Sequence, residues 1–227
     1  MNDLEHLKRT AWKESDSTAA KLFMRPISIR ITKAILRTGI GPTSVTVTAF
    51  LVKIAASLLF PLNLYLLTAL AGLLVYLSHV LDCVDGELAR AKKIASSSGT
   101  LLDYFLDRLS DIVLYSSIAI ALLISTGDQR TLILGMFVIA SNFFMTDVGQ
   151  ATANLRAKVR VKRPRVYRYF YYGGSANTMI VLAASIANRL IVGMVLVAVL
   201  SFAFTVVRFF EAYTVLRKEK GSGSRQT

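Results

Sequence analysis

Long apolar stretches constrain this chain more than any other feature of its sequence. The 227-residue chain is 54% hydrophobic, and a helix needs about 20 largely apolar residues to cross the hydrocarbon layer of a membrane. We predict an all-α integral membrane protein with six transmembrane helices, at 43–60, 64–88, 98–125, 131–155, 174–188 and 190–216. The fifth of these stretches, 174–188, is short by that measure.

A short amphipathic segment precedes the first of these stretches. Within 26–37, isoleucines share one face and basic side chains another, and the segment is too short and too charged to span. This pattern predicts an interfacial helix on the cytoplasmic surface. The chain would then comprise a cytoplasmic N-terminal segment (1–42), a six-helix transmembrane domain (43–216) and a cytoplasmic tail that we expect to be disordered (217–227).

Basic residues are distributed unevenly along the predicted spans. With the N-terminus inside, nearly all of the 27 Lys and Arg residues flank cytoplasmic ends; only Arg130 and Arg189 lie outside, and Lys53, Arg108 and Arg208 fall within spans. Cytoplasmic loops carry this excess of positive charge, so we expect both termini in the cytoplasm. The net charge of +13 could suggest nucleic acid, but the long uncharged stretches argue against it. Anionic lipid and phosphorylated substrates are the expected partners.

Four aspartates stand where two apolar segments meet at the cytoplasmic side. Asp82 and Asp85 are three residues apart, Asp103 and Asp107 are four apart, and each pair therefore falls on one face of its helix. Carboxylates are costly in a membrane and by default mark a functional site. If the four carboxylates converge, their negative charge needs a positive partner. Oxygen ligands favour hard divalent cations such as Mg²⁺.

The surrounding residues form a longer pattern with fixed spacing. It resembles the signature of the CDP-alcohol phosphotransferase family, D-x2-D-G-x2-A-R-x8-G-x3-D-x3-D, and every specified position matches. The matching residues are Asp82, Asp85, Gly86, Ala89, Arg90, Gly99, Asp103 and Asp107.

This resemblance implies an enzyme of phospholipid synthesis. Such an enzyme transfers a substituted phosphate from a CDP-linked donor, such as CDP-diacylglycerol or an ether analogue, to the hydroxyl of an acceptor alcohol and releases CMP. Two Mg²⁺ (or Mn²⁺) ions would be held by Asp82, Asp85, Asp103 and Asp107, with Asp107 also acting as the base. The resemblance also implies a homodimer.

Further residues of the pattern are expected to receive the nucleotide of the donor. Asp82 and Asp85 would contribute to this site, Gly86 and Ala89 would let the nucleotide approach the helix backbone closely, and Arg90 would support the nucleotide or hold the loop. Gly99 would permit close packing where the third span begins.

The start of the first span also resembles the family, with two departures. Residues 41–46 read G-P-T-S-V-T where the family has T-P-N-x-(V/I)-T, so Gly41 replaces Thr and Thr43 replaces Asn. Thr43 or Ser44 can still cap the helix. We expect Thr43 at the donor site, without the side-chain amide contact.

Basic and polar residues near the end of the fourth span are candidates for binding the acceptor. Arg156 and Arg160 belong to a run of basic residues that could grip a phosphate, which favours inositol phosphate or glycerol phosphate. The alternative is a polybasic strip facing anionic lipid. A polar stripe on the fourth span, formed by Asp147, Gln150 and Asn154, leads away from this run and adds three candidates. Arg208, near the end of the sixth span, is a further candidate.

Other readings stay open at this point. The same carboxylates could serve a cation- or proton-coupled transporter, although transporters place charge near the midplane and often carry inverted repeats, and no internal repeat is visible. An inactive scaffold is a third reading, and a soluble CDP-polyol could replace the lipid donor. Asp111 is expected to pair with Arg108, His79 to pack or support a ligand, and Lys53 either to pair with a carboxylate or to snorkel.

Overall fold

The computed structural model describes residues 16–159 and 171–223, and this part of the chain is helical. A short π-helical turn, η1 (Ala20–Met24), leads into α2 (Arg25–Ile35). The bundle that follows consists of α3 (Pro42–Leu59), a 3₁₀ turn η2 (Phe60–Leu62), α4 (Tyr65–Ala91), α5 (Ser97–Thr126), α6 (Arg130–Val159), α8 (Gly174–Ile186) and α9 (Leu190–Gly223).

Over the described residues, the structure confirms an all-helical fold with five helices long and apolar enough to cross a membrane. These are α3, α4, α5, α6 and α9, within a few residues of the predicted bounds except that α9 continues beyond 216 to Gly223. The fifth predicted span corresponds to α8, which has only 13 residues and is too short to cross a bilayer alone.

Local sequence signals explain where these helices begin and end. Pro42 occupies the first turn of α3, where its missing N–H is not needed. Ser96 caps α5 by accepting a hydrogen bond from the Gly99 amide at 3.1 Å. α5 ends at Thr126 and is followed by Gly127, whose φ of 68° is the left-handed conformation that glycine adopts without strain.

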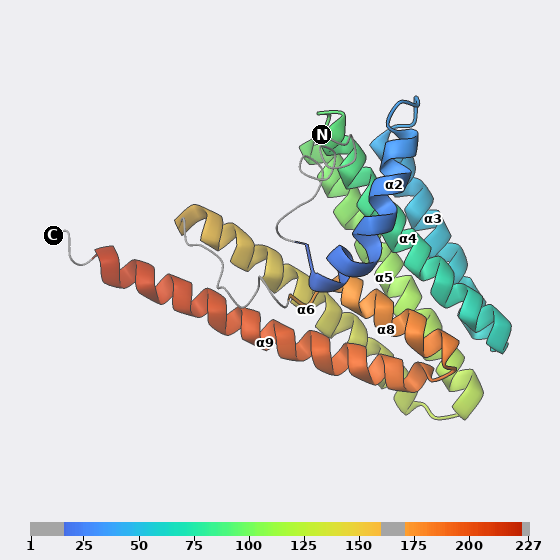
Figure 1. Ribbon diagram of the computed structural model, residues 1–227. Coiled ribbons are helices and arrows are strands. Elements are labelled where there is room, and N and C mark those ends of the chain that lie inside the picture. Colours follow the sequence, from blue (N-terminus) through green and yellow to red (C-terminus); the bar gives the residue numbers. More distant parts are fainter. Residues whose placement is uncertain (1–15, 160–170, 224–227) are drawn as a thin grey trace.

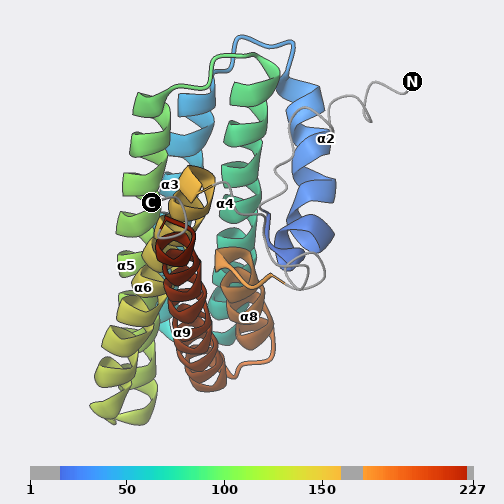
Figure 2. The same ribbon diagram turned by 90° about the vertical axis from the view of Figure 1, so that its left-hand side faces the viewer.

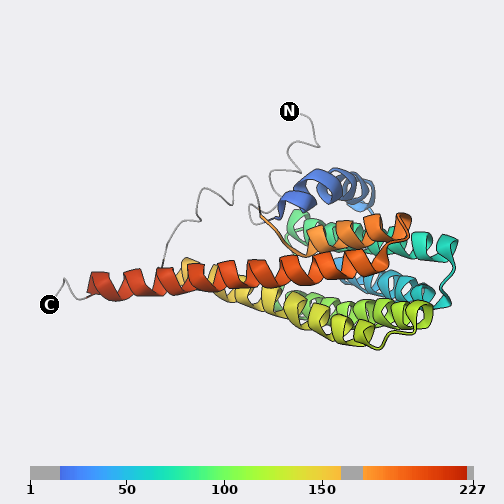
Figure 3. The same cartoon turned by 90° about the horizontal axis from the view of Figure 1, so that it is seen from below.

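The helices form two groups that share one core. α3, α4 and α5 pack together, while α6 lies alongside α9, and these two reach past the other helices at one end (Figure 1, Figure 3). α8 packs between α4 and α9. Close approaches depend on small residues, as is common between membrane helices: a Cβ on Gly72 would lie 2.5 Å from that of Ser185, and one on Gly135 would lie 2.5 Å from that of Ala119.

The N-terminal helix α2 stands beside α4 (Figure 2) and is held there by a buried polar cluster. Glu87 on α4 has no exposed surface and accepts hydrogen bonds from Arg25, Ser28 and Thr32, each at 2.7 Å. The face of α2 toward α4 therefore carries polar side chains beside Ile31 and Ile35, which pack against the apolar cluster of Val84 and Leu88, whereas Ile27 is 39% exposed. An interfacial position for α2 stays a prediction.

Candidate functional site

The carboxylates predicted from the sequence converge between α4 and α5, which both pack against α3. One carboxylate oxygen from each of Asp82, Asp85 and Asp103 lies within 4.8 Å of the other two. Asp107, one turn after Asp103, lines the same cavity. Such a set of hard oxygen donors fits a divalent cation, whose charge would offset the repulsion between the acids.

Thr46 on α3 orients one of these acids. Its hydroxyl donates a hydrogen bond to Oδ2 of Asp85 at 2.6 Å. The contact is part-buried, and Asp85 is only 5% exposed. A hydrogen bond of this kind fixes the direction of a ligand and affects metal affinity. No role for Thr46 followed from the sequence, although this residue belongs to the pattern that begins α3.

The residues expected at the donor site surround a pocket of about 200 Å³ between α3, α4 and the start of α5. Gly86 lies where an added Cβ would be 3.1 Å from the Arg90 guanidinium. The pocket shares Asp85, Gly86, Arg90 and Asp103 with a larger cavity, which Asp82 lines without lining this pocket. The expected donor residues that line the pocket are Thr43, Asp85, Gly86, Ala89, Arg90 and Gly99.

A larger cavity of about 530 Å³ extends from the carboxylates toward α6, α8 and α9. Of the residues expected to bind the acceptor, Gln150 and Arg208 line this cavity. Asp147 is exposed on α6, where it accepts a hydrogen bond from the Tyr104 hydroxyl at 2.7 Å and borders an apolar groove. Asn154 is exposed and does not line the cavity.

Two arginines expected at the acceptor site are engaged in contacts within the protein. Arg208 on α9 donates to the backbone carbonyls of Met145 and Tyr172, both at 2.6 Å, so it ties α6 to the chain that precedes α8. Arg156 forms an ion pair with Glu211 between α6 and α9. Arg160 lies outside the described residues.

A part-buried ion pair lies at the inner end of the carboxylate stripe on α5. The Lys53 ammonium is 2.5 Å from Oδ1 of Asp111, and the Asn142 amide donates to Oδ2 at 2.9 Å. Arg108, the expected partner of Asp111, is 3.6 Å away. Asn142 in turn accepts from Asn177 at 3.0 Å, so polar contacts continue from α3 through α5 and α6 to α8.

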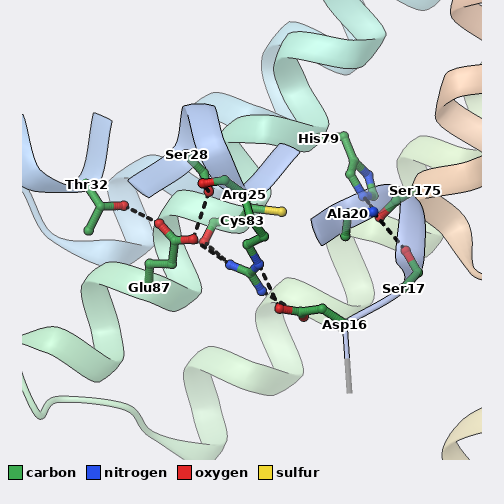
Figure 4. A network of polar contacts seen from close by, with 10 residues as sticks. All are labelled: Asp16, Ser17, Ala20, Arg25, Ser28, Thr32, His79, Cys83, Glu87 and Ser175. Atoms are coloured by element: carbon green, nitrogen blue, oxygen red, sulfur yellow. Dashed lines mark hydrogen bonds and ion pairs between the residues drawn. The ribbon is translucent and has the colours of Figure 1, made fainter. Parts of the chain in front are cut away.

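His79 joins α4 to the beginning of α8. Its Nε2 lies 2.8 Å from the Ser175 hydroxyl (Figure 4), and a ring nitrogen lies within 4.8 Å of ligand atoms on Asp82 and Cys83. This position, one turn before Asp82, agrees with the expected packing or supporting role.

The N-terminal segment forms one wall of the larger cavity, which the sequence analysis missed. Asp16, Ser17 and Arg25 line the cavity together with the carboxylates. Thr18 and Tyr171 exchange hydrogen bonds: the Thr18 amide donates to the Tyr171 carbonyl at 3.0 Å, and the Tyr171 amide donates to the Thr18 hydroxyl at 2.9 Å.

The Arg25 guanidinium connects this segment to α4. It donates twice to Asp16 at 2.8 Å and once to Glu87 at 2.7 Å (Figure 4). Burial alone would lower the pKa of Arg25, but the hydrogen bonds and charges of these acids more than compensate, and its pKa is raised. No sequence signal identified this clamp, because Glu87 occupies an unspecified position of the signature.

Known proteins resemble this chain over most of its length. An archaetidylinositol phosphate synthase of Pyrococcus horikoshii is 29% identical over 184 residues, which cover 81% of this chain and 89% of that protein. A crystal structure of Mycobacterium tuberculosis phosphatidylinositol phosphate synthase with CDP-DAG bound superimposes with a TM-score of 0.65 at 23% identity, covering 83% of this chain and 94% of that one. A structure of the same protein with manganese and citrate gives a TM-score of 0.63 at 23% identity, covering 83% and 90%. These structures establish the fold.

The family is established by a direct match to the sequence. The model of the CDP-alcohol phosphatidyltransferase family matches residues 40–207, a range that contains the four aspartates, the donor pocket and the greater part of the larger cavity. The geometry and this match agree, and the chain belongs to the CDP-alcohol phosphatidyltransferase family.

Proposed function

We propose that this membrane enzyme transfers a phosphatidyl-type group from a CDP-linked lipid to a hydroxyl of an inositol phosphate. The acceptor oxygen forms a bond to the phosphorus that carries the lipid, and the bond from that phosphorus to the bridging oxygen of CMP breaks. The acceptor proton passes to a base, and CMP leaves with the electron pair of the broken bond. A transporter has no support from the family to which the chain belongs.

One observation carries this proposal: two compartments of different size meet at the same carboxylates. The pocket of about 200 Å³ contains the donor part of the signature, and the cavity of about 530 Å³ opens toward three other helices. Asp85 and Asp103 line both. A donor and an acceptor bound on the two sides would meet there, which is the alignment that a bimolecular transfer needs.

The acids of the site have distinct proposed roles. Asp82, Asp85 and Asp103 would hold Mg²⁺ or Mn²⁺, two ions in all, with Asp107 beside them. When bound, these ions supply neutralising charge for the diphosphate. Asp107 would accept the acceptor proton, because it lines the larger cavity and not the donor pocket.

The nature of both substrates is inferred from relatives. The Pyrococcus relative is an archaetidylinositol phosphate synthase, and the structural neighbour was crystallised with CDP-DAG and is a phosphatidylinositol phosphate synthase. A phosphorylated acceptor also fits a cavity that contains basic side chains, namely Arg25, Lys53, Arg90, Arg108 and Arg208.

The membrane arrangement is proposed on similar grounds. We place α8 as a sixth, short membrane element beside the five long helices, with both termini and the carboxylates at the cytoplasmic face. That assignment follows from the distribution of Lys and Arg. The division into 1–42, 43–216 and 217–227, and a homodimer, remain predictions.

The direct test is CMP release by purified protein supplied with Mg²⁺ and CDP-diacylglycerol. Serine, glycerol 3-phosphate and inositol 1-phosphate would be offered in turn, together with the variant Asp107→Asn and the matched control Asp128→Asn, which changes an exposed acid between α5 and α6. We expect release that depends on inositol phosphate, is lost in Asp107→Asn and is kept in Asp128→Asn. Release with another acceptor alone would overturn the acceptor assignment, and full activity of Asp107→Asn would overturn its role.

A further inference from the structure

Arg108 is a largely buried cation, and two of its guanidinium nitrogens have no hydrogen-bond partner among the described residues. It follows Asp107 in the sequence and lines the larger cavity, and its side chain is 15% exposed. Its Nε and Nη1 are buried without a hydrogen-bond partner among the described residues. Leaving charged donors unsatisfied is costly, so a partner that enters the cavity would be favoured.

The nearby carboxylate does not meet this need. Nη2 of Arg108 is 3.6 Å from Asp111, which is too long for a good hydrogen bond. Both oxygens of Asp111 already have closer partners, Lys53 at 2.5 Å and Asn142 at 2.9 Å. Lys53 therefore balances the charge of Asp111 and leaves the guanidinium of Arg108 available.

Two aromatic rings hold this guanidinium in position. Its Cζ lies 5.6 Å from the centre of the Tyr104 ring and 5.1 Å from that of Phe143. The Tyr104 ring is itself anchored, because its hydroxyl donates to Asp147 at 2.7 Å. Cation–π contacts stabilise the charge but do not occupy the N–H groups, and a planar guanidinium held in this way can donate two hydrogen bonds to one phosphate.

The position of Arg108 distinguishes between the two substrates. It lines the larger cavity and is absent from the donor pocket, whereas Gly86 and Arg90 line both and Ala89 lines only the donor pocket. Asp107, the proposed base, is its neighbour in sequence and lines the same cavity. A phosphate bound by Arg108 would therefore belong to the molecule whose hydroxyl is deprotonated.

We propose that Arg108 binds the phosphate of the acceptor and thereby selects a phosphorylated alcohol. This inference rests on the proposed transfer to an inositol phosphate. It assigns to the acceptor site a residue that the sequence suggested only as a partner of Asp111, and it gives Asp147 an indirect part through Tyr104.

The test compares Arg108→Gln and Arg108→Lys with the matched control Arg189→Gln, an exposed arginine beyond α8. In CMP release, we expect Arg108→Gln to raise the KM for inositol 1-phosphate by roughly tenfold or more, as for the loss of a charge-assisted hydrogen bond. The KM for CDP-diacylglycerol should change little. Arg108→Lys should recover part of the loss, because it restores the charge without the two-pronged geometry.

A second measurement does not depend on turnover. Inositol 1-phosphate should raise the thermal unfolding midpoint of the purified wild-type protein and of Arg189→Gln, and it should do so much less in Arg108→Gln. CDP-diacylglycerol should stabilise all three, which shows that the variant is folded.

The outcomes separate this inference from the proposed function. If the wild-type enzyme does not use inositol phosphate, the proposed function fails before Arg108 is considered. If it does, and Arg108→Gln keeps a normal KM for the acceptor or raises only the KM for the donor, the assignment of Arg108 is wrong. A larger acceptor KM with lost stabilisation by inositol phosphate supports it.

Discussion

The ammonium of Lys53 on α3 and a carboxylate oxygen of Asp111 on α5 lie 2.5 Å apart, one helical turn beyond Asp107. This ion pair joins two helices behind the site and balances one acid of a stripe that would otherwise carry only negative charge. It also explains why a lysine stands in the middle of an apolar segment. Removing one partner of a buried pair is far more harmful than removing both.

We therefore expect Lys53→Met to lower the free energy of unfolding by about 3 kcal/mol, because Asp111 would lose its nearest cation. The double variant Lys53→Met/Asp111→Leu should recover part of this loss. Denaturation of the detergent-solubilised protein measures both effects, with the exposed Lys33→Met as control. A double variant as unstable as the sum of its single changes would show that the two residues act independently.

The clamp on Glu87 leads to a second stability prediction. Glu87→Gln would place an amide N–H against one of the three donors. We therefore expect the free energy of unfolding to fall by about 2–3 kcal/mol. Ser28→Ala removes one neutral donor and should cost about 1 kcal/mol. The same denaturation measurement tests this order, and equal stability of Glu87→Gln and the wild type would contradict the importance of the cluster.

Thr46 should tune the affinity for the divalent cation through Asp85. Thr46→Val keeps the shape of the side chain but removes the donor to Oδ2. We expect the Mn²⁺ concentration for half-maximal CMP release to rise by about tenfold. Thr48→Val is the matched control, because Thr48 is exposed on the same helix and bonds only to the Ser44 carbonyl. Equal metal dependence of the two variants would remove Thr46 from the site.

Gly149 on α6 provides the space through which Arg208 reaches its carbonyl partners. A Cβ at this position would overlap Nη1 of Arg208, so Gly149→Ala should displace the guanidinium from Met145 and Tyr172. We expect CMP release to fall by about tenfold or more. Gly39→Ala is the control, since nothing lies within 4 Å of its added Cβ; similar activity of both variants would mean that Arg208 can move without consequence.

The acids could be located from the sequence because they lie close along the chain. Spacings of three and four residues put Asp82 with Asp85 and Asp103 with Asp107 on single helical faces, and a short loop brings the two helices together. The five long helices followed in the same way from continuous apolar stretches. The shortest stretch gave α8, whose 13 residues leave its relation to the membrane a prediction.

Contacts between distant segments could not be predicted in this way. The stripe of Asp147, Gln150 and Asn154 indicated a polar face on α6 but not its neighbours, and only Gln150 lines the cavity. The pairing of Arg156 with Glu211 likewise depends on how α6 and α9 cross. The amphipathic pattern of 26–37 indicated the apolar face, from which Ile31 and Ile35 pack against the cluster that contains Val84 and Leu88 of α4. It did not predict the hydrogen bonds of Arg25, Ser28 and Thr32 to Glu87.

The hydrogen bonds that converge on Glu87 also bear on where the folding unit of this enzyme begins. The family match starts at residue 40, but all three donors to Glu87 precede it in the chain. A protein trimmed to the family boundary would retain every signature aspartate but lose all three groups that donate hydrogen bonds to the Glu87 carboxylate. The segment that the family match covers is thus shorter than the segment that must fold together.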